Sequence, residues 1–272
     1  MAVAYHVLLA EDSPLNQDVG KAMLETLGCA VDVAANGAEA LRMAAMTRYD
    51  LVFMDCQMPL MDGCEATVKI REDENGKGPR VPIIALTAHM MESDREKCLS
   101  AGMDDFLSKP FRLKELAEML SRWTGRSETV VRAEPGATAP CSKQPLDEQT
   151  AQRLSASPDD CIEPGALENI RSLQKAGSPD MLKRVIQIYM TDSVLLIDEM
   201  IKALAEEDPE ALRKAAHKLK SSSANLGAGR LAGFCRQVEE IGRAESTEGI
   251  SALISLIRKE HRIVEEALSK EI

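Results

Sequence analysis

The sequence predicts an α/β domain built on a doubly wound parallel sheet, followed by an all-α domain. Short apolar runs alternate with helical patterns through residue 124, whereas only helical patterns occur after Pro164. The segment between these parts is rich in Ala, Pro, Thr, Ser, Glu and Gly and lacks apolar periodicity, which is typical of a linker. We therefore expect domains at residues 1–124 and 164–272, joined by a flexible linker at residues 125–163.

Five short apolar runs in the first part predict buried strands, and a helical pattern follows each of them. Capping residues support the helix boundaries, because Ser13 and Pro14 make a favourable start and Gly28 and Gly102 stand where helices are expected to end. The strands are expected at 5–10, 30–34, 51–54, 81–86 and 105–107, and the helices at 14–27, 38–46, 63–71, 93–101 and 113–123. Five such units indicate a five-stranded parallel sheet with helices on both faces.

The second part reads as a helical bundle with a four-helix core. Breaks in the pattern occur at Gly, Pro and short polar runs, which commonly end helices. The helices are expected near 165–175, 179–206, 209–225, 228–244 and 247–270. A shorter stretch at 146–154, within the linker, is expected to form at most a transient helix, because it has little apolar surface to bury.

Composition and charge limit the classes of function. Apolar residues make up 44% of the chain and aromatic residues only 3%, so aliphatic side chains must fill the cores. A net charge of −11 argues against nucleic-acid binding, which needs a basic surface. The seven cysteines form no CxxC motif, and no run of 18 apolar residues occurs. We expect a cytoplasmic chain that does not itself enter a membrane, although a longer parent protein could be anchored in one.

Polar side chains follow four of the predicted strands at the point where each strand ends. Glu11 and Asp12 follow the first strand, Asp55 the third, Thr87 the fourth and Lys109 the fifth. Because the carboxyl ends of parallel strands share one edge of the sheet, these groups should converge. Crowded carboxylates attract a hard divalent cation such as Mg²⁺, and a Lys and a Thr beside them suit phosphoryl transfer onto an aspartate. As a residue at a strand end, Lys109 is expected to affect chemistry rather than folding.

The segments LLAEDSPLNQ, YDLVFMDCQMPLMDGCEAT, VPIIALTAHM and GMDDFLSKPF resemble the receiver domain of response regulators and hybrid histidine kinases, which has a flavodoxin-like fold. The resemblance covers essentially all of residues 4–124. It implies that Asp55 is the phosphoacceptor and that Asp12 binds Mg²⁺ directly. It further implies that Glu11 acts on the metal mainly through water, and that the backbone carbonyl of Gln57 completes the protein ligands.

The same resemblance assigns three further roles. Thr87 would be the switch hydroxyl, and the Lys109 ammonium would contact the phosphoryl group. Phe106 stands at the switch aromatic, which is often Tyr in this family, so a switch that depends on a phenol is not expected here. Glu11 replaces a common Asp, a change that lengthens one contact around the metal.

A single histidine marks the second part of the chain. If each residue of the helix around 211–226 turns by about 100°, Leu212 heads an apolar stripe and His217 lies about 140° away from it. We therefore expect His217 to be exposed. Arg213 and Lys220 flank it at positions i−4 and i+3, where cations would stabilise a phosphoryl group on the imidazole.

The helix AAHKLKSSSANLGAGRL resembles the histidine-containing phosphotransfer (Hpt) domain, over about residues 164–270. The shared pattern is a His, a Lys three residues later, small residues and then Leu-Gly. The resemblance implies that His217 is phosphorylated and that Lys220 is its supporting cation. Family members often have Gly directly after that Lys, where this chain has Ser221.

Together these features predict a two-component phosphorelay protein. The receiver would take phosphate from the phosphohistidine of an upstream histidine kinase domain and exchange it with His217 or another Hpt histidine, while a downstream receiver would be a further partner. The two sites are expected to meet within or between chains. The chain shows no ATP-binding kinase domain of its own, so we expect the C-terminal part of a hybrid histidine kinase or a stand-alone relay protein.

Two alternatives compete with this interpretation. An aspartyl-phosphate phosphatase would use a similar set of residues but needs a second Asp two positions after the nucleophile, where this chain has Gln57. A pure interaction module with one silent phosphosite is the other alternative.

Overall fold

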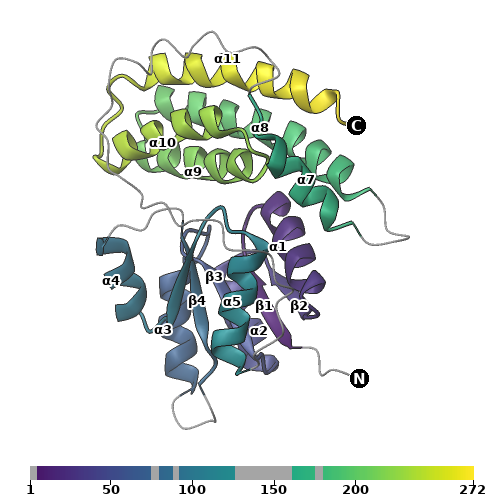
Figure 1. Ribbon diagram of the computed structural model, residues 1–272. Coiled ribbons are helices and arrows are strands. Elements are labelled where there is room, and N and C mark those ends of the chain that lie inside the picture. Colours follow the sequence, from purple (N-terminus) through teal and green to yellow (C-terminus); the bar gives the residue numbers. More distant parts are fainter. Residues whose placement is uncertain (1–4, 75–79, 88–91, 126–160, 175–179) are drawn as a thin grey trace.

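A computed structural model describes most of the chain as two domains, an α/β domain and a helical domain that lies against one end of it (Figure 1). The described residues are 5–74, 80–87, 92–125, 161–174 and 180–272. The expected linker lies almost wholly outside these residues, as does the short helix considered at 146–154.

The α/β domain contains one sheet of five parallel strands in the order β2-β1-β3-β4-β5. The strands are β1 (His6–Ala10), β2 (Ala30–Ala34), β3 (Leu51–Asp55), β4 (Ile83–Thr87) and β5 (Asp105–Ser108). The helices are α1 (Pro14–Thr26), α2 (Gly37–Met46), α3 (Gly63–Glu74), α4 (Glu92–Ser100) and α5 (Leu113–Thr124). The predicted doubly wound sheet is confirmed, and the ends of its elements differ from the predictions by a few residues.

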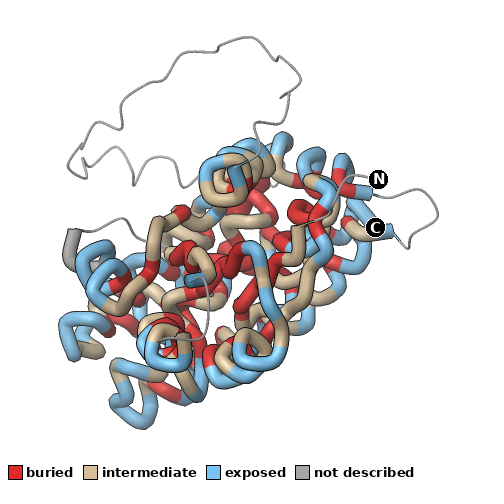
Figure 2. The backbone as a smooth tube through the Cα atoms, turned by 90° about the horizontal axis from the view of Figure 1, so that it is seen from below, coloured by how far each residue is buried: buried red, intermediate tan, exposed pale blue. Residues whose placement is uncertain are grey.

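Helices cover both faces of this sheet, as the alternation of side chains along each strand requires. Leu9 and Phe53 pack with α1 and α5 on one face. Leu8 and Met54, each one residue away, pack with α2, α3 and α4 on the other face. All four side chains are fully or almost fully buried, and buried positions run through the interior of the molecule in Figure 2. Burial on both faces explains why the strands appear as continuous apolar runs.

The helical domain is a bundle, as predicted. Its helices are α7 (Pro164–Ser172), α8 (Met181–Ala205), α9 (Pro209–Asn225), α10 (Gly229–Arg243) and α11 (Ile250–Ser269). Helices α8, α9, α10 and α11 each contact the next, and α11 returns to α8, so these four form the core while α7 packs on α8. Leu219, Val238 and Ile257 are completely buried inside it.

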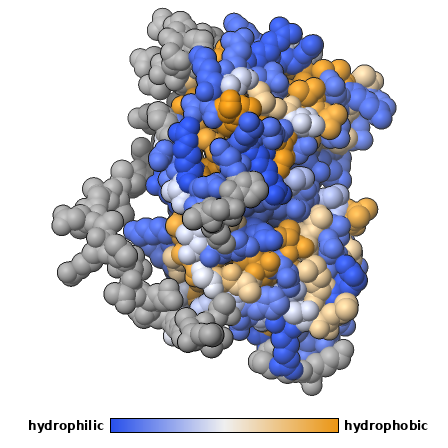
Figure 3. Space-filling view, turned by 90° about the vertical axis from the view of Figure 1, so that its right-hand side faces the viewer, coloured by the Kyte–Doolittle hydropathy of each residue, from blue (hydrophilic) through white to orange (hydrophobic). Residues whose placement is uncertain are grey.

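The two domains meet through α1, which packs against α8 and α9 (Figure 1). Leu15 of α1 is buried and lines a small cavity together with Tyr189 and Leu196 of α8. On the surface viewed in Figure 3, hydrophilic residues cover much of both domains, with apolar patches between them. The contact places the carboxyl edge of the sheet next to α9, the helix that carries the predicted phosphohistidine.

Candidate functional site

The carboxyl edge of the sheet brings together the side chains that the sequence places at its strand ends. Oxygen atoms from Glu11, Asp12 and Asp55 lie within 4.8 Å of one another. Lys109, directly after β5, places its Nζ 2.6 Å from Asp55 Oδ2 and also pairs with Glu11. Thr87, the last residue of β4, lines the same cavity as Asp55. The structure thus confirms that these five side chains converge.

Lys109 is more deeply embedded than a residue at a strand end was expected to be. Its side chain is only 5% exposed. Burial alone would lower the pKa of Lys109, but the carboxylates of Asp55 and Glu11 raise it above its ordinary value. Since removing one partner of a buried ion pair is costly, this burial favours a contribution of Lys109 to stability, unlike the expectation that it affects chemistry rather than folding.

Asp55 is buried beside both a lysine and a second carboxylate. Burial raises the pKa of Asp55 to about 6, Lys109 opposes this rise and the neighbouring Glu11 adds to it. Its Oδ1 accepts a hydrogen bond of 3.1 Å from the backbone N–H of Gln57. The following helix approaches very closely, because a Cβ atom at Gly63 would lie 2.1 Å from the carbonyl oxygen of Asp55. Gly63 therefore allows α3 to begin directly beside the acceptor.

The donor set at this edge fits a hard divalent cation. Among the described residues of this domain, Glu11 and Asp55 share Lys109 as their ion-pair partner and Asp12 lies beside them, which leaves excess negative charge. Asp12 Oδ2 is a buried oxygen without a hydrogen-bond partner among the described residues. Lys218 of α9 brings its Nζ to 2.9 Å from this oxygen, but without the alignment of a hydrogen bond. Glu11, Asp12 and Asp55 could thus hold Mg²⁺, which prefers such oxygen ligands.

On α9, His217 is fixed by a buried glutamate from the neighbouring helix α10. The imidazole Nδ1 lies 2.9 Å from Glu239 Oε1, and the Lys220 ammonium pairs with the other carboxylate oxygen. Burial alone would raise the pKa of Glu239, but the hydrogen bonds and charges of His217 and Lys220 lower it to about 2. Desolvation lowers the pKa of Lys220, and Glu239 opposes that effect.

The prediction that His217 is exposed was wrong. The residue is 5% exposed, because α10 supplies Glu239 on one side and the α/β domain covers the other. Its Nε2 is buried and has no hydrogen-bond partner among the described residues. The helical pattern placed His217 correctly away from the core stripe of α9, but it contained no information on what packs against that outer face.

Asp55 and His217 line one cavity of about 200 Å³ between the two domains. Arg213 and Arg243 also line this cavity. Arg213 Nη1 donates a hydrogen bond of 3.2 Å to Gln57 Oε1, which ties α9 to the loop after Asp55. The carboxyl group of Asp55, the imidazole of His217 and two guanidinium groups thus line one cavity.

Comparison with known proteins matches each half of the chain to a family. Residues 7–121 match the family model of the response regulator receiver domain, and residues 184–267 match that of the Hpt domain. The chain contains a receiver domain followed by an Hpt domain. This is the architecture of two-component phosphorelay proteins.

Individual relatives align with almost the whole of this chain. The sensor histidine kinase GacS of Pseudomonas protegens is 32% identical over 269 residues, covering 97% of this chain and 27% of the relative. The histidine-protein kinase BarA of Escherichia coli is 30% identical over 249 residues, covering 90% of this chain and 25% of the relative. The chain therefore spans about a quarter of the length of these relatives.

Among solved structures, the receiver domain of a sensor histidine kinase from Pseudomonas aeruginosa, with magnesium in its active-site cleft, is similar to the receiver domain of this chain. It is 51% identical, with a TM-score of 0.43, and the match covers 46% of this chain and all of that one.

Sequence reasoning missed two residues of the Hpt site, Glu239 and Arg243. A signal existed for the first of them. Leu231, Cys235 and Val238 are buried on one stripe of α10, and position 239 falls on the same stripe, so a charged residue there should have a buried partner. No comparable signal was available for Arg243, which is exposed at the end of α10.

Phe106, the predicted switch aromatic, lies in β5. The guanidinium of Arg95 in α4 lies 4.7 Å from the centre of its ring. This contact joins α4 to the strand next to the Asp55 pocket. Phe106 is thus linked to a neighbouring helix although its ring carries no hydroxyl group.

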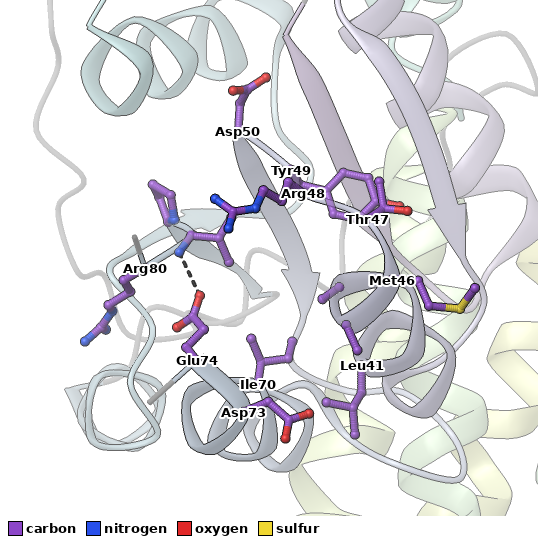
Figure 4. Close-up of a pocket in the computed structure, with 14 residues that line it drawn as sticks. Leu41, Met46, Thr47, Arg48, Tyr49, Asp50, Ile70, Asp73, Glu74 and Arg80 are labelled. Carbon is purple, nitrogen blue, oxygen red and sulfur yellow. Dashed lines mark hydrogen bonds between the residues drawn. The ribbon is translucent and has the colours of Figure 1, made fainter. Parts of the chain in front are cut away.

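A larger pocket, of about 530 Å³, opens at the opposite end of the receiver sheet (Figure 4). Its lining includes Tyr49, Asp50 and Arg80, together with Glu74, which accepts a hydrogen bond of 2.7 Å from Val81 N. None of the predicted site residues lines it. A still larger pocket, of about 640 Å³, lies between the two domains, and Asp12, Gln57 and His217 line it.

Within the described ranges, no helix combines the length and the apolar character needed to cross a membrane.

Proposed function

We propose that the chain passes phosphoryl groups between Asp55 of the receiver and His217 of the Hpt domain. The observation that carries this proposal is the cavity that both residues line, together with the buried Nε2 of His217, which has no hydrogen-bond partner among the described residues. The proposed division of the chain is a receiver at residues 1–124, a flexible linker at 125–163 and an Hpt domain at 164–272.

Transfer to the receiver begins with the carboxylate of Asp55. One of its oxygens attacks the phosphorus of a phosphohistidine, the new O–P bond forms as the N–P bond breaks, and the imidazole nitrogen recovers its lone pair. The Lys109 ammonium, 2.6 Å from Asp55 Oδ2, neutralises charge on the phosphoryl oxygens. The Thr87 hydroxyl hydrogen-bonds one of those oxygens once the group is bound.

In the opposite direction, His217 Nε2 is the nucleophile and the Asp55 carboxylate is the leaving group. Attack through Nε2 requires that Nδ1 carry the proton, and Glu239 at 2.9 Å is placed to accept a hydrogen bond from it. The imidazole becomes positively charged when Nε2 bonds to phosphorus, and the Glu239 carboxylate balances that charge. Lys220 supports the site by pairing with this same carboxylate.

The receiver step requires a cation beside the acceptor. Glu11, Asp12, Asp55 and the backbone carbonyl of Gln57 are the proposed Mg²⁺ ligands. When bound, the ion would neutralise charge on the phosphoryl oxygens during transfer. The three clustered carboxylates and the buried oxygen of Asp12 that has no hydrogen-bond partner among the described residues support this assignment.

The partners follow from this chemistry. An upstream histidine kinase domain would supply phosphate to Asp55, and a downstream receiver would accept phosphate from His217. The relatives are sensor kinases about four times as long, which supports a place for this chain at the C-terminal end of a hybrid histidine kinase in the cytoplasm, with other parts of that protein able to anchor it. The chain would then supply the phosphotransfer steps and not the ATP-dependent kinase step.

The phosphatase alternative is less well supported by the geometry. Its mechanism needs a carboxylic acid two residues after the nucleophile, and Gln57 occupies that position. The Gln57 side chain accepts a hydrogen bond from Arg213 of the Hpt domain, which is a docking contact.

Labelling with a small acyl-phosphate donor and Mg²⁺ tests the proposal. Phosphate should appear first on Asp55 as an acid-stable, hydroxylamine-labile acyl phosphate, and then on the Hpt segment as acid-labile, base-stable phosphohistidine. Asp55→Asn should abolish both signals because an amide is a far poorer nucleophile. His217→Gln should retain the first and abolish the second. Full labelling of the Asp55→Asn chain, or no phosphohistidine in the unsubstituted chain, would contradict the proposal; the latter outcome would favour the silent-site alternative.

A further inference from the structure

A buried amide connects the two domains at the first turn of α1. Asn16 is only 6% exposed, although it lies on the surface of the receiver that faces the Hpt domain. Its Nδ2 donates hydrogen bonds of 3.0 Å to Glu11 Oε1 and to Ser221 Oγ. Its Oδ1 accepts a hydrogen bond of 2.7 Å from Asn225 Nδ2. Both amide hydrogens and the carbonyl oxygen are therefore used.

Two of these three bonds come from the Hpt helix α9. A docking helix without the hydroxyl and the carboxamide would bury Asn16 and leave an N–H and an oxygen unsatisfied. A buried polar group without a partner costs on the order of 1–3 kcal/mol, more than an ordinary hydrogen bond contributes. Asn16 therefore disfavours docking of a helix that lacks these two groups more strongly than it favours docking of a helix that has them.

We propose that Asn16 is a specificity residue through which this receiver selects its own Hpt domain. It recognises an Hpt helix that carries a hydroxyl four residues after the phosphorylatable histidine and a carboxamide eight residues after it, the positions of Ser221 and Asn225. The inference deepens the proposed function, on which it rests, by naming the chemistry that the partner must display.

Two departures from the usual family patterns meet at this amide. Ser221 stands where Hpt domains often have Gly, which offers no side-chain acceptor. Glu11 stands where receivers commonly have Asp, and its Oε1 is the second acceptor for Asn16. The other oxygen of Glu11 pairs with Lys109, which also pairs with Asp55. Recognition of the Hpt helix is thereby connected to the phosphoacceptor pocket through direct contacts.

The neighbouring Ser222 provides a matched control on the same helix. Its Oγ donates to the carbonyl oxygens of Lys218 and Leu219 within α9, at 3.1 Å and 3.2 Å. Replacing Ser221 or Ser222 by Ala changes helix propensity equally. Only the first replacement removes an acceptor from the domain contact.

The test measures docking through the reactivity of His217 in the full chain. Diethyl pyrocarbonate modifies exposed imidazoles, and His217 is covered in the docked arrangement, so its modification rate follows the undocked fraction. Peptide mass spectrometry would measure the modification of His217, with His6 in the same chain as an internal reference.

Ser221→Ala should raise the modification rate of His217 at least about fivefold, whereas Ser222→Ala should leave it within twofold. In an Asn16→Ala background, Ser221→Ala should have no further effect, because its partner is gone.

An unchanged His217 rate in Ser221→Ala would overturn the inference. So would an equal rise in Ser222→Ala, or a Ser221→Ala effect that persists at full size in the Asn16→Ala background. Failure of the proposed function gives a different result: docking would respond as described, but phosphate loaded on Asp55 would never reach His217 in the unsubstituted chain.

Discussion

Asp55 and Glu239 are both almost completely buried, yet their surroundings move their proton affinities in opposite directions. Asp55 in the receiver and Glu239 in the Hpt domain are 2% and 1% exposed. Burial raises the pKa of Asp55 to about 6, whereas the partners of Glu239 overcome the effect of burial and lower its pKa to about 2. The difference lies in their neighbours: a second carboxylate, Glu11, raises the pKa of Asp55, whereas His217 and Lys220 both lower that of Glu239.

Asp55 shares one lysine with Glu11, and Asp12 lies beside them, so the receiver pocket contains more negative charge than its own side chains neutralise. Such a pocket attracts a metal ion and, in the docked arrangement, also Lys218 of the Hpt domain. Glu239 instead interacts with both His217 and Lys220, which leaves the Hpt site balanced without a metal. The receiver site is built to accept a cation, and the Hpt site is built to hold an imidazole in one orientation.

The largest expected effect comes from Glu239→Ala. The substitution leaves the Lys220 ammonium buried without its counter-charge, and breaking a buried pair in this way costs about 3–5 kcal/mol. Urea unfolding followed by far-UV circular dichroism should show this loss in the Hpt transition. Trp123, the single tryptophan of the chain, lies in α5 and reports the receiver transition separately by fluorescence.

Two further variants sharpen this prediction. Glu240→Ala, at the exposed neighbouring position, should change the stability by no more than about 0.5 kcal/mol. Glu239→Gln keeps an acceptor for His217 Nδ1 but removes the charge, so it should cost an intermediate amount. Equal losses for Glu239→Ala and Glu240→Ala would mean that the pairing with Lys220 contributes nothing to the Hpt fold.

Lys109→Ala tests the excess of negative charge in the receiver site. Without the ammonium, Glu11 and Asp55 repel each other in a buried site, and we expect a loss on the order of 2–4 kcal/mol in the receiver transition without Mg²⁺. Millimolar Mg²⁺ should recover much of it, because bound metal stabilises the folded state alone. The control is Lys114→Ala, whose side chain is 80% exposed and should matter little. If Mg²⁺ restores nothing, the role of Lys109 is packing, not charge balance.

The same comparison explains what the sequence could and could not predict. The receiver site was predictable because parallel strands bring their carboxyl ends to one edge, so residues that directly follow strands in the sequence must meet in space. The start of α1 was predictable from Ser13, whose hydroxyl accepts a hydrogen bond from Asn16 N at 3.5 Å, and from Pro14. In a helical bundle no such rule applies, because the sequence does not state which helix faces which.

The Hpt site was therefore only half predictable. His217 and Lys220 share a helix and could be related by helical spacing, but Glu239 comes from a different helix and was missed. The exposure of His217 was mispredicted for the same reason, since both α10 and the receiver cover it. Contacts between the domains, such as those of Asn16, leave no periodic signal in either half.

The smallest expected effect comes from the exposed ion pair at the domain contact. Arg184 of α8 forms an ion pair with Asp18 of α1, with its Nε 2.8 Å from Oδ2, and its Nη2 donates a hydrogen bond of 3.0 Å to Oδ1. The Arg184 side chain is 64% exposed, so water and salt screen the pair. Arg184→Ala should weaken docking by no more than about 1 kcal/mol, less than Ser221→Ala, even though it removes a full charge.

The modification rate of His217 at low salt and at about 0.5 M salt would measure this difference. The small effect of Arg184→Ala should vanish at high salt, whereas that of Ser221→Ala should persist. A salt-independent effect of Arg184→Ala larger than that of Ser221→Ala would show that charge at the edge of the contact, and not the buried amide, determines how the two domains recognise each other.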